Sequence, residues 1–357
     1  MSSAWRDLVR VSLRGESAYH VPVPSVIRVK LDANESPFGL SEAARASVAA
    51  ALTEPSLNRY PDAHAVALKA VLASKLGVSP EHLSLGNGSD ETLGLLCAAF
   101  GEPRDGRPAR VVIPWPSFVV YRTAALAAGL VPVEVPLGRD FAADPAALLD
   151  AVKRERPNLV FLATPNNPTG TVWPRELIET LCSEHPDVIT VVDEAYLPYS
   201  DQPSCIELTR IYPHCVVVQT LSKVGLAGLR VGYLVAHPEV IATVEKVRPP
   251  YNLNSLSQRA ATVIVSHHAD ELEAHYRVIR GERERLRTAL TAHGLEVFPS
   301  QANLLLVRSP NATELWRQLG ARGIAVRNFD RPGPLAGCLR ITVGTPQEND
   351  ELLAALG

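Results

Sequence analysis

Short runs of apolar, mostly β-branched residues alternate with helix-like stretches through the middle of the chain. The apolar runs span residues 109–114, 131–137, 159–164, 188–192, 215–220 and 231–236. They do not alternate between polar and apolar positions, so we expect strands that are buried on both faces. The stretches 117–128, 145–153 and 175–184 between them are expected to be helices. Strands that alternate with helices predict an open, mostly parallel sheet with right-handed crossovers.

The pattern changes after a proline-rich break at residues 248–252. One long helical pattern over 255–293 comes next, and strands and helices then follow at 303–307, 313–320, 324–327, 339–343 and 348–356. We therefore expect a large domain over 45–250, and a linking helix with a small C-terminal α+β domain over 251–357. Residues 1–44 are expected to form an N-terminal arm that joins the small domain.

Composition excludes several classes of protein. A chain of 357 residues is too long for one simple core, and 46% hydrophobic with 20% charged residues is ordinary for a globular enzyme. The net charge of −3 argues against a nucleic-acid or anionic-membrane partner. The chain has an odd number of cysteines and no C-x-x-C pair, which indicates a reducing cytoplasm and neither a disulfide frame nor a zinc site. The cysteines are Cys97, Cys182, Cys205, Cys215 and Cys338. The histidine spacing also predicts no metal site, and no apolar run approaches membrane-spanning length.

Lys223 is the most informative single residue, because it follows an apolar run almost directly. A buried, unpaired ammonium group is energetically costly, so a functional role is favoured over a purely structural one. An amine in a partly desolvated cleft acts as a nucleophile toward carbonyl groups.

Other polar side chains at strand ends match the needs of pyridoxal 5′-phosphate. The cofactor's aldehyde needs an amine, which Lys223 supplies, and its ring nitrogen needs a carboxylate, for which Asp193 is placed. Tyr196 and Asn167 can donate to the ring's 3-oxygen, and Phe118 can lie against the ring face. Taken alone, Asp193 could instead cap a helix and Phe118 could belong to the core.

A glycine-rich turn at residues 86–88 precedes a helical stretch, an arrangement that forms a cradle for anions such as the cofactor phosphate. Ser222 and Arg230 can add a hydroxyl group and a bidentate cation. Taken alone, such glycines more often form just an ordinary turn.

With these motifs the chain resembles the fold-type I pyridoxal-phosphate aminotransferases, and within them the histidinol-phosphate aminotransferases. The matching segments run from about residue 19 to 350 and include ANESPFG at 33–39, RYPD at 59–62, GNGSDE at 86–91, PNNPTG at 165–170, DEAY at 193–196, TLSK at 220–223, RPPYN at 248–252, SQAN at 300–303 and GCLRITVG at 337–344. The resemblance implies an α/β fold, with a mostly parallel sheet flanked by helices in the large domain and a smaller α+β domain.

The resemblance also implies roles for single residues. Lys223 would be catalytic, and the cofactor would be bound by Ser89, Asp90, Phe118, Asn167, Asp193, Tyr196, Ser222, Lys223 and Arg230. Tyr60 would reach the cofactor phosphate from the partner subunit of a homodimer. Tyr19, Asn34, Arg327 and Arg340 would bind the substrate, with the two arginines on its anionic end. A surface ion pair is the structural alternative for these arginines.

The implied reaction transfers an amino group between L-histidinol phosphate and 2-oxoglutarate, giving imidazole-acetol phosphate and L-glutamate in histidine biosynthesis. An aromatic amino-acid aminotransferase or a threonine-phosphate decarboxylase on the same fold is the nearest alternative, and a ligand-sensing regulator is a more distant one.

Two positions depart from the family pattern. Lys223 and Arg230 are seven positions apart where the family usually has eight, which puts the contact of Arg230 with the phosphate in question. Phe118 stands where many relatives have tyrosine.

Overall fold

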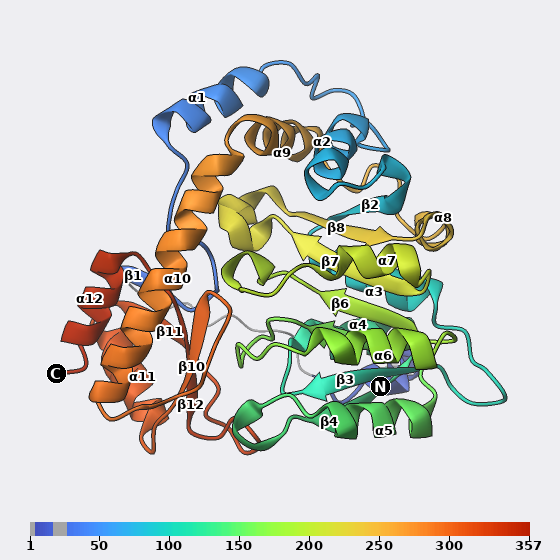
Figure 1. The fold of residues 1–357 in the computed structure, drawn as a ribbon. Helices are drawn as coiled ribbons and strands as arrows, with labels where there is room; N and C mark the ends of the chain where they lie inside the picture. Colours follow the sequence, from blue (N-terminus) through green and yellow to red (C-terminus); the bar gives the residue numbers. More distant parts are fainter. Residues whose placement is uncertain (1–3, 17–26) are drawn as a thin grey trace.

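The computed structural model describes residues 4–16 and 27–357. Its fold consists of two β-sheets with helices packed against them (Figure 1). The larger sheet has seven strands in the order β2-β8-β7-β6-β5-β3-β4. These strands are β2 (Leu83–Asn87), β3 (Arg110–Trp115), β4 (Val131–Pro136), β5 (Leu159–Ala163), β6 (Ile189–Asp193), β7 (Cys215–Thr220) and β8 (Val231–Ala236). All pairings are parallel except those of β8, which runs antiparallel to both neighbours. The predicted α/β fold with a mostly parallel sheet is confirmed.

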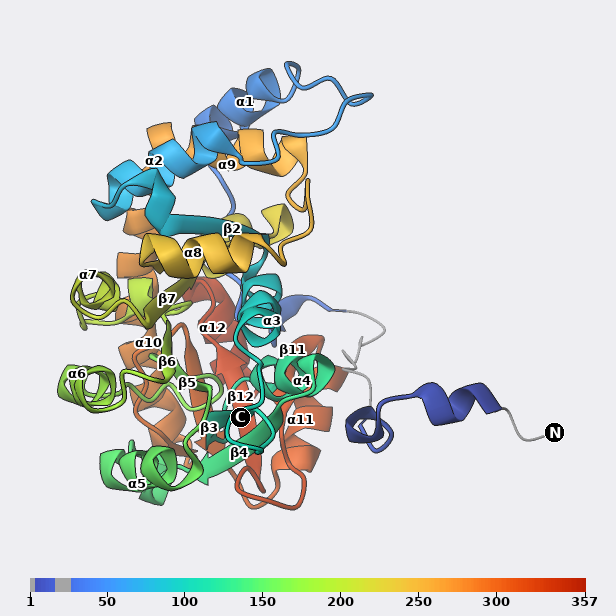
Figure 2. The ribbon, with the colours of Figure 1, turned by 90° about the vertical axis from the view of Figure 1, so that its right-hand side faces the viewer.

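Helices cover both faces of this sheet, as the edge-on view shows (Figure 2). One face carries α3 (Ser89–Ala99) and α4 (Val119–Ala128), and the other carries α5 (Pro145–Glu155), α6 (Arg175–Glu184) and α7 (Leu208–Ile211). Neighbouring residues of one strand belong to opposite cores: Val217 packs with α5 and α6, whereas Val216 and Val218 pack with α3 and α4. Burial on both faces explains why the strands are apolar without alternation.

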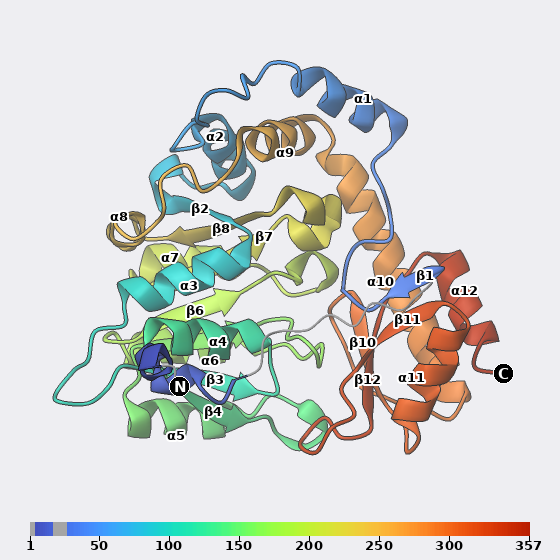
Figure 3. The ribbon, with the colours of Figure 1, turned by 180° about the vertical axis from the view of Figure 1, so that it is seen from behind.

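The smaller sheet has the order β1-β11-β12-β10-β9. Its strands are β1 (Val29–Leu31), β9 (Glu296–Val297), β10 (Leu304–Arg308), β11 (Ile324–Asn328) and β12 (Cys338–Thr342), and α11 (Ala312–Ala321) and α12 (Pro346–Ala354) pack with them. β1 pairs in parallel with β11, so a segment from near the N-terminus lies in a sheet built mainly from the C-terminal part (Figure 3). The domain boundaries near residues 44 and 250 stay a prediction.

Two helices occupy the region where the sequence predicts one. α9 (Ser255–His267) ends where His268 takes non-helical angles (φ −130°, ψ 20°), and α10 (Ala269–Ala292) then begins in a new direction. The prediction of a single helix over 255–293 is therefore wrong. Helical periodicity continues across the break, and the acidic residues Asp270 and Glu271 lie in the first turn of α10, where they favour a new N-terminus.

The remaining α-helices of the described chain are α1 (Glu42–Ala51), α2 (Val66–Leu76) and α8 (Pro238–Glu245). Near the N-terminus lie two short 3-10 turns, η1 (Ala4–Leu8) and η2 (Val11–Leu13), of which η2 packs against α4 while η1 projects away from it (Figure 2). Within the described ranges, none of the helices combines the length and apolar character needed to cross a membrane.

Candidate active site

A pocket opens where β5, β6 and β7 end, at the carboxyl edge of the large sheet. Nine of the residues predicted to bind the cofactor line it, together with four that were not predicted: Ser89, Asp90, Phe118, Asn167, Asp193, Tyr196, Ser222, Lys223 and Arg230, with Tyr121, Ala163, Ala195 and Thr220. This edge is where ligands bind in open α/β sheets. Residues far apart in the sequence therefore meet because their strands are neighbours.

Asp193 is a buried carboxyl at the last position of β6. The Tyr121 hydroxyl donates a hydrogen bond to its Oδ2 at 2.7 Å, and the backbone N–H of Ala195 donates to its Oδ1 at 3.0 Å. Burial raises the pKa of the Asp193 carboxyl to about 6, against the opposing effects of both hydrogen bonds and of the Lys223 charge. The alternative interpretation as a helix cap is wrong, because Asp193 ends a strand and its carboxylate points into the pocket.

Tyr121 lines the pocket and holds Asp193, but it was not predicted from the sequence. It is 1% exposed, lies on α4, and stacks on Phe161 of β5 with a centroid distance of 5.1 Å. Phe118 stands three positions earlier and meets Tyr121 edge to face at 5.7 Å, so it packs with the core and also lines the pocket. The spacing of three is the available sequence signal, since it places both rings on one side of the helix.

Glu194 was also left unassigned, and its role is structural. This carboxylate is 1% exposed and faces away from the pocket of Asp193. It accepts hydrogen bonds from the Ser204 hydroxyl, the Cys205 N–H and the Gln219 amide at 2.6–2.7 Å. Burial raises the pKa of the Glu194 carboxyl, and these donors oppose that shift. Glu194 thereby ties the 204–205 loop to the end of β7.

Lys223 lies in an irregular turn directly after β7. Its half-buried side chain places Nζ 5.8 Å from the centroid of the Tyr196 ring. Residues 222–226 form one π-helical turn, within which Gly225 takes a left-handed conformation (φ 105°) that side-chain-bearing residues rarely adopt.

The shortened link after Lys223 still delivers Arg230 to the pocket. Arg230 takes a left-handed conformation (φ 51°) after a second short turn. Its guanidinium lies 3.3 Å from the Ser222 hydroxyl and 3.4 Å from the Asp90 carboxylate. Gly225 absorbs the change in chain direction, whereas Gly228 does not adopt a positive φ.

The glycine turn forms an anion cradle next to this guanidinium. α3 begins at Ser89, immediately after Gly88 (φ 82°), so its first free N–H groups point toward the pocket. A Cβ atom on Gly88 would collide with the Arg230 guanidinium, and one on Gly232 would collide with the backbone of Ser89. Only glycine at these two positions allows strand, helix and arginine to come this close.

Residues of the small sheet reach the same pocket residues. Arg340 is buried on β12 and donates to Asn167 Oδ1 and to the Asp32 carbonyl, both at 2.6 Å. For Arg340, the alternative of a surface ion pair is therefore wrong. Arg327 stands directly opposite it on β11, which places two guanidinium groups on one face of the sheet. Asn34 donates to the Tyr196 hydroxyl at 3.0 Å.

One residue predicted to bind the cofactor, Tyr60, does not line the pocket. Tyr60 is 81% exposed and stacks on Tyr251 with a centroid distance of 4.5 Å. Tyr19 lies outside the described residues.

The described residues fit pyridoxal phosphate. A buried carboxyl (Asp193) suits a protonated ring nitrogen, and the glycine cradle with Arg230 suits a phosphate. An amine (Lys223) lines the same pocket. In the described part of the chain, no group of three His, Cys, Asp or Glu side chains is placed to hold a metal ion.

The first prediction concerns the Tyr121–Asp193 hydrogen bond. The folded-state pKa of about 6 exceeds the ordinary 3.8, so the cost of burying the Asp193 charge is absent at low pH and grows as pH rises through this window. Tyr121 offsets that cost only when Asp193 is ionised. Tyr121→Phe should therefore lower the free energy of unfolding by about 1.5–3 kcal/mol near pH 8 and by roughly 0.5–1.5 kcal/mol near pH 5, as urea titrations would show.

The matched control is Tyr233→Phe, because the Tyr233 hydroxyl is also buried but donates to a neutral amide, Gln219 Oε1, at 2.8 Å. Its effect should be similar at both pH values. Equal losses at the two pH values for Tyr121→Phe would contradict the assigned role.

Comparison with known proteins agrees with this geometry. The family described as aminotransferase class I and II matches residues 26–356. The chain is 43% identical to a histidinol-phosphate aminotransferase of Methylibium petroleiphilum, over 98% of this chain and 93% of that protein, and 42% identical to histidinol-phosphate aminotransferase 1 of Ralstonia nicotianae with the same coverage. A crystal structure of histidinol-phosphate aminotransferase from Sinorhizobium meliloti in complex with pyridoxal 5′-phosphate superposes with a TM-score of 0.83 at 29% identity, covering 95% of this chain and 94% of that one. The chain belongs to the class I and II aminotransferases.

Proposed function

We propose that this protein transfers an amino group between L-histidinol phosphate and 2-oxoglutarate in histidine biosynthesis, with pyridoxal phosphate as cofactor. The observation that carries the proposal is one pocket that holds a buried carboxyl, an amine and a glycine-lined anion cradle, with two arginines beside it. The relatives named above support the choice of substrate.

Different residues of the pocket would bind different parts of the cofactor. Asp193 would keep the ring nitrogen protonated, and Tyr196 with Asn167 would hold the 3-oxygen. Phe118 would lie against the ring face. The start of α3, with Ser89 and Asp90, would surround the phosphate together with Ser222 and Arg230. When bound, pyridoxal phosphate withdraws electrons from the substrate carbon that carries the amino group.

Lys223 would carry the proton that moves during the transfer. Its Nζ lies in the pocket beside the Tyr196 ring, within the half-buried cleft that favours amine nucleophilicity. We propose that the Lys223 amine, when free, would act as general base, accepting the proton of the substrate carbon that bears the amino group and holding it on Nζ for return in a 1,3-shift. The Tyr121 hydroxyl meanwhile holds the Asp193 carboxylate in place.

The arginine pair selects for an anionic substrate. Arg340 is fixed by Asn167 and by the Asp32 carbonyl, and Arg327 stands opposite it. Like charges on facing residues repel, so an anion between or beside them is stabilising. In histidinol phosphate this anion is a phosphate group, whereas in the aromatic amino acids it is a carboxylate. Threonine phosphate carries both groups, and its decarboxylation is the remaining alternative.

We further propose a homodimer in the cytoplasm, with sites that both subunits complete. Tyr60 stacks on Tyr251 outside its own pocket, and Leu57, three residues earlier in the chain, is 78% exposed. Trp5 and Leu8 near the N-terminus are 63% and 86% exposed. Such apolar surface is typical of contact between subunits. Tyr60 of the partner subunit would then reach the cofactor phosphate.

The direct test is a set of single half-reactions of the protein loaded with pyridoxal phosphate. Absorbance should change fastest with histidinol phosphate, more slowly with phenylalanine, and phosphothreonine should release no carbon dioxide. Lys223→Ala should lose turnover by at least about a thousandfold, since it removes both nucleophile and base. A preference for phenylalanine, carbon dioxide release, or catalytic turnover by Lys223→Ala would each overturn the proposal.

Shared sites predict complementation between two defective variants. Lys223→Ala and Tyr60→Ala homodimers should each be impaired, the first severely. After mixing and subunit exchange, a heterodimer contains one site with both an intact Lys223 and an intact partner tyrosine. Activity above the sum of the unmixed samples is expected in an assay of histidinol phosphate turnover. Strictly additive activities, with exchange verified by native mass spectrometry, would contradict the sharing of sites.

A further inference from the structure

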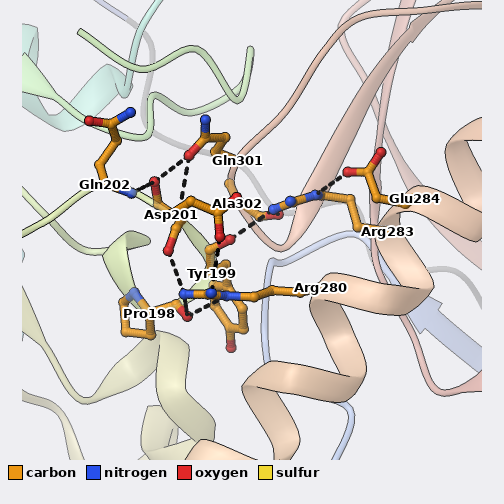
Figure 4. Close-up of polar contacts among 10 residues, drawn as sticks. Pro198, Tyr199, Asp201, Gln202, Arg280, Arg283, Glu284, Gln301 and Ala302 are labelled. Carbon is orange, nitrogen blue, oxygen red and sulfur yellow. Dashed lines mark hydrogen bonds and ion pairs between the residues drawn. The ribbon is translucent and has the colours of Figure 1, made fainter. Parts of the chain in front are cut away.

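Two arginines of the linking helix α10 grip the backbone that follows Tyr196 (Figure 4). The Arg280 guanidinium donates to the Pro198 carbonyl from Nη2 at 2.9 Å and from Nε at 3.2 Å, and it also donates to the Ser200 carbonyl. Arg283 donates from Nη1 to the Tyr199 carbonyl at 2.9 Å. Three consecutive carbonyls, at residues 198–200, are thus held from one helix. We call residues 198–200 with these two arginines the carbonyl clamp.

Arg283 extends the clamp to the small sheet. The same Nη1 donates to the Ala302 carbonyl at 3.2 Å, just before β10. Its side chain is 7% exposed, so these bonds are shielded from competing water. The clamp therefore joins the linking helix, the segment after β6 and the segment that leads into β10 (Figure 4).

Tyr199 carries the connection to the catalytic lysine. Its hydroxyl donates to the main-chain carbonyl of Lys223 at 2.6 Å. The ring is fully buried, packs with Ile279 of α10, and meets Tyr276 edge to face at 5.6 Å. Tyr199 is therefore fixed at its backbone by Arg283, at its ring by α10, and at its hydroxyl by the turn that bears Lys223.

The turn that bears Lys223 has few regular hydrogen bonds of its own, so contacts from other segments help to fix its backbone. Residues 222–226 form a single π-helical turn with non-helical angles at Val224 and Gly225, so it lacks the regular ladder of a longer helix. The Tyr199 hydroxyl is a strong donor, and a buried hydrogen bond to a carbonyl fixes the direction of that peptide group.

We propose that Tyr199 is a positioning residue for Lys223, and that the carbonyl clamp on α10 holds Tyr199 in place for this task. The position of the linking helix thereby sets the backbone from which the lysine side chain projects. The effect of this positioning on catalysis rests on the proposed function. The connection between Tyr199 and the backbone of residues 222–226 does not.

The coupling can be measured in the cofactor-free protein by hydrogen–deuterium exchange. Tyr199→Phe keeps the ring and removes the hydrogen bond, so exchange in peptides covering residues 222–226 should accelerate roughly three- to tenfold. Peptides covering α6 serve as the reference for global stability and should not change. Tyr276→Phe is the matched control, because its ring belongs to the same cluster while its hydroxyl makes no hydrogen bond within the described residues. Equal exchange in Tyr199→Phe and Tyr276→Phe would overturn the proposal.

The clamp is tested by a double-mutant cycle on the same peptides. Arg280→Gln should also accelerate exchange at 222–226, and combining it with Tyr199→Phe should add little, because both act through one connection. The exposed Arg277, one turn earlier on α10, provides the control Arg277→Gln. Fully additive effects of Arg280→Gln and Tyr199→Phe, or equal effects of Arg280→Gln and Arg277→Gln, would contradict the role of the clamp.

Binding of pyridoxal phosphate separates this inference from the proposed function. The rate at which the cofactor-free protein captures added pyridoxal phosphate, followed by absorbance, should fall about three- to tenfold in Tyr199→Phe and remain unchanged in Tyr276→Phe. Wild-type protein that fails to capture the cofactor would refute the proposed function. Wild-type capture with no difference between the two tyrosine variants would refute the positioning role alone.

Discussion

The burial of the Asp193 carboxyl at the end of β6 is the constraint on which the rest of the site depends. A carboxylate out of water is costly unless donors and a cation compensate it. Tyr121, the Ala195 N–H and the nearby charge of Lys223 provide that compensation, and the pKa of Asp193 nevertheless stays raised to about 6. The parallel sheet makes this possible, because it aligns the ends of β5, β6 and β7 at one edge.

Contacts from the small sheet complete the pocket. Arg340 of β12 holds Asn167, and Asn34, three residues after β1, holds the Tyr196 hydroxyl, so each residue proposed to bind the cofactor's 3-oxygen is tied to the small sheet or to the segment next to it. The carbonyl clamp on α10 forms a third tie, to the turn that carries Lys223. Residues proposed to bind the cofactor are therefore held by hydrogen bonds that come from several parts of the chain.

Much of this could be predicted from the sequence, because strands buried on both faces are apolar along their whole length. β7 and β8 begin and end where the pattern places them, and so does α6. The break at His268 escaped prediction because helical periodicity continues through it. β9 was also missed, since two residues are too few to form a pattern.

The site shows the same limit. Asp193 and Lys223 are visible as polar residues that end apolar runs, and motif resemblance supplies their partners. Tyr121 was missed because a tyrosine on a core-facing helix resembles any other packed aromatic residue until its partner is known. Arg230 could not be placed from its spacing alone, because the left-handed Gly225 determines the path of the loop. The roles of Tyr60 and Tyr19 stay predictions.

Lys223 is proposed to be the amine that engages the cofactor, in the same pocket as the buried Asp193. The most direct measurement is reduction of the protein loaded with pyridoxal phosphate by borohydride, followed by peptide mass spectrometry. We expect one pyridoxyl group per chain, attached to Lys223. Labelling that falls mainly on another lysine, such as Lys69 or Lys246, or stoichiometric binding that leaves Lys223 unlabelled, would contradict it.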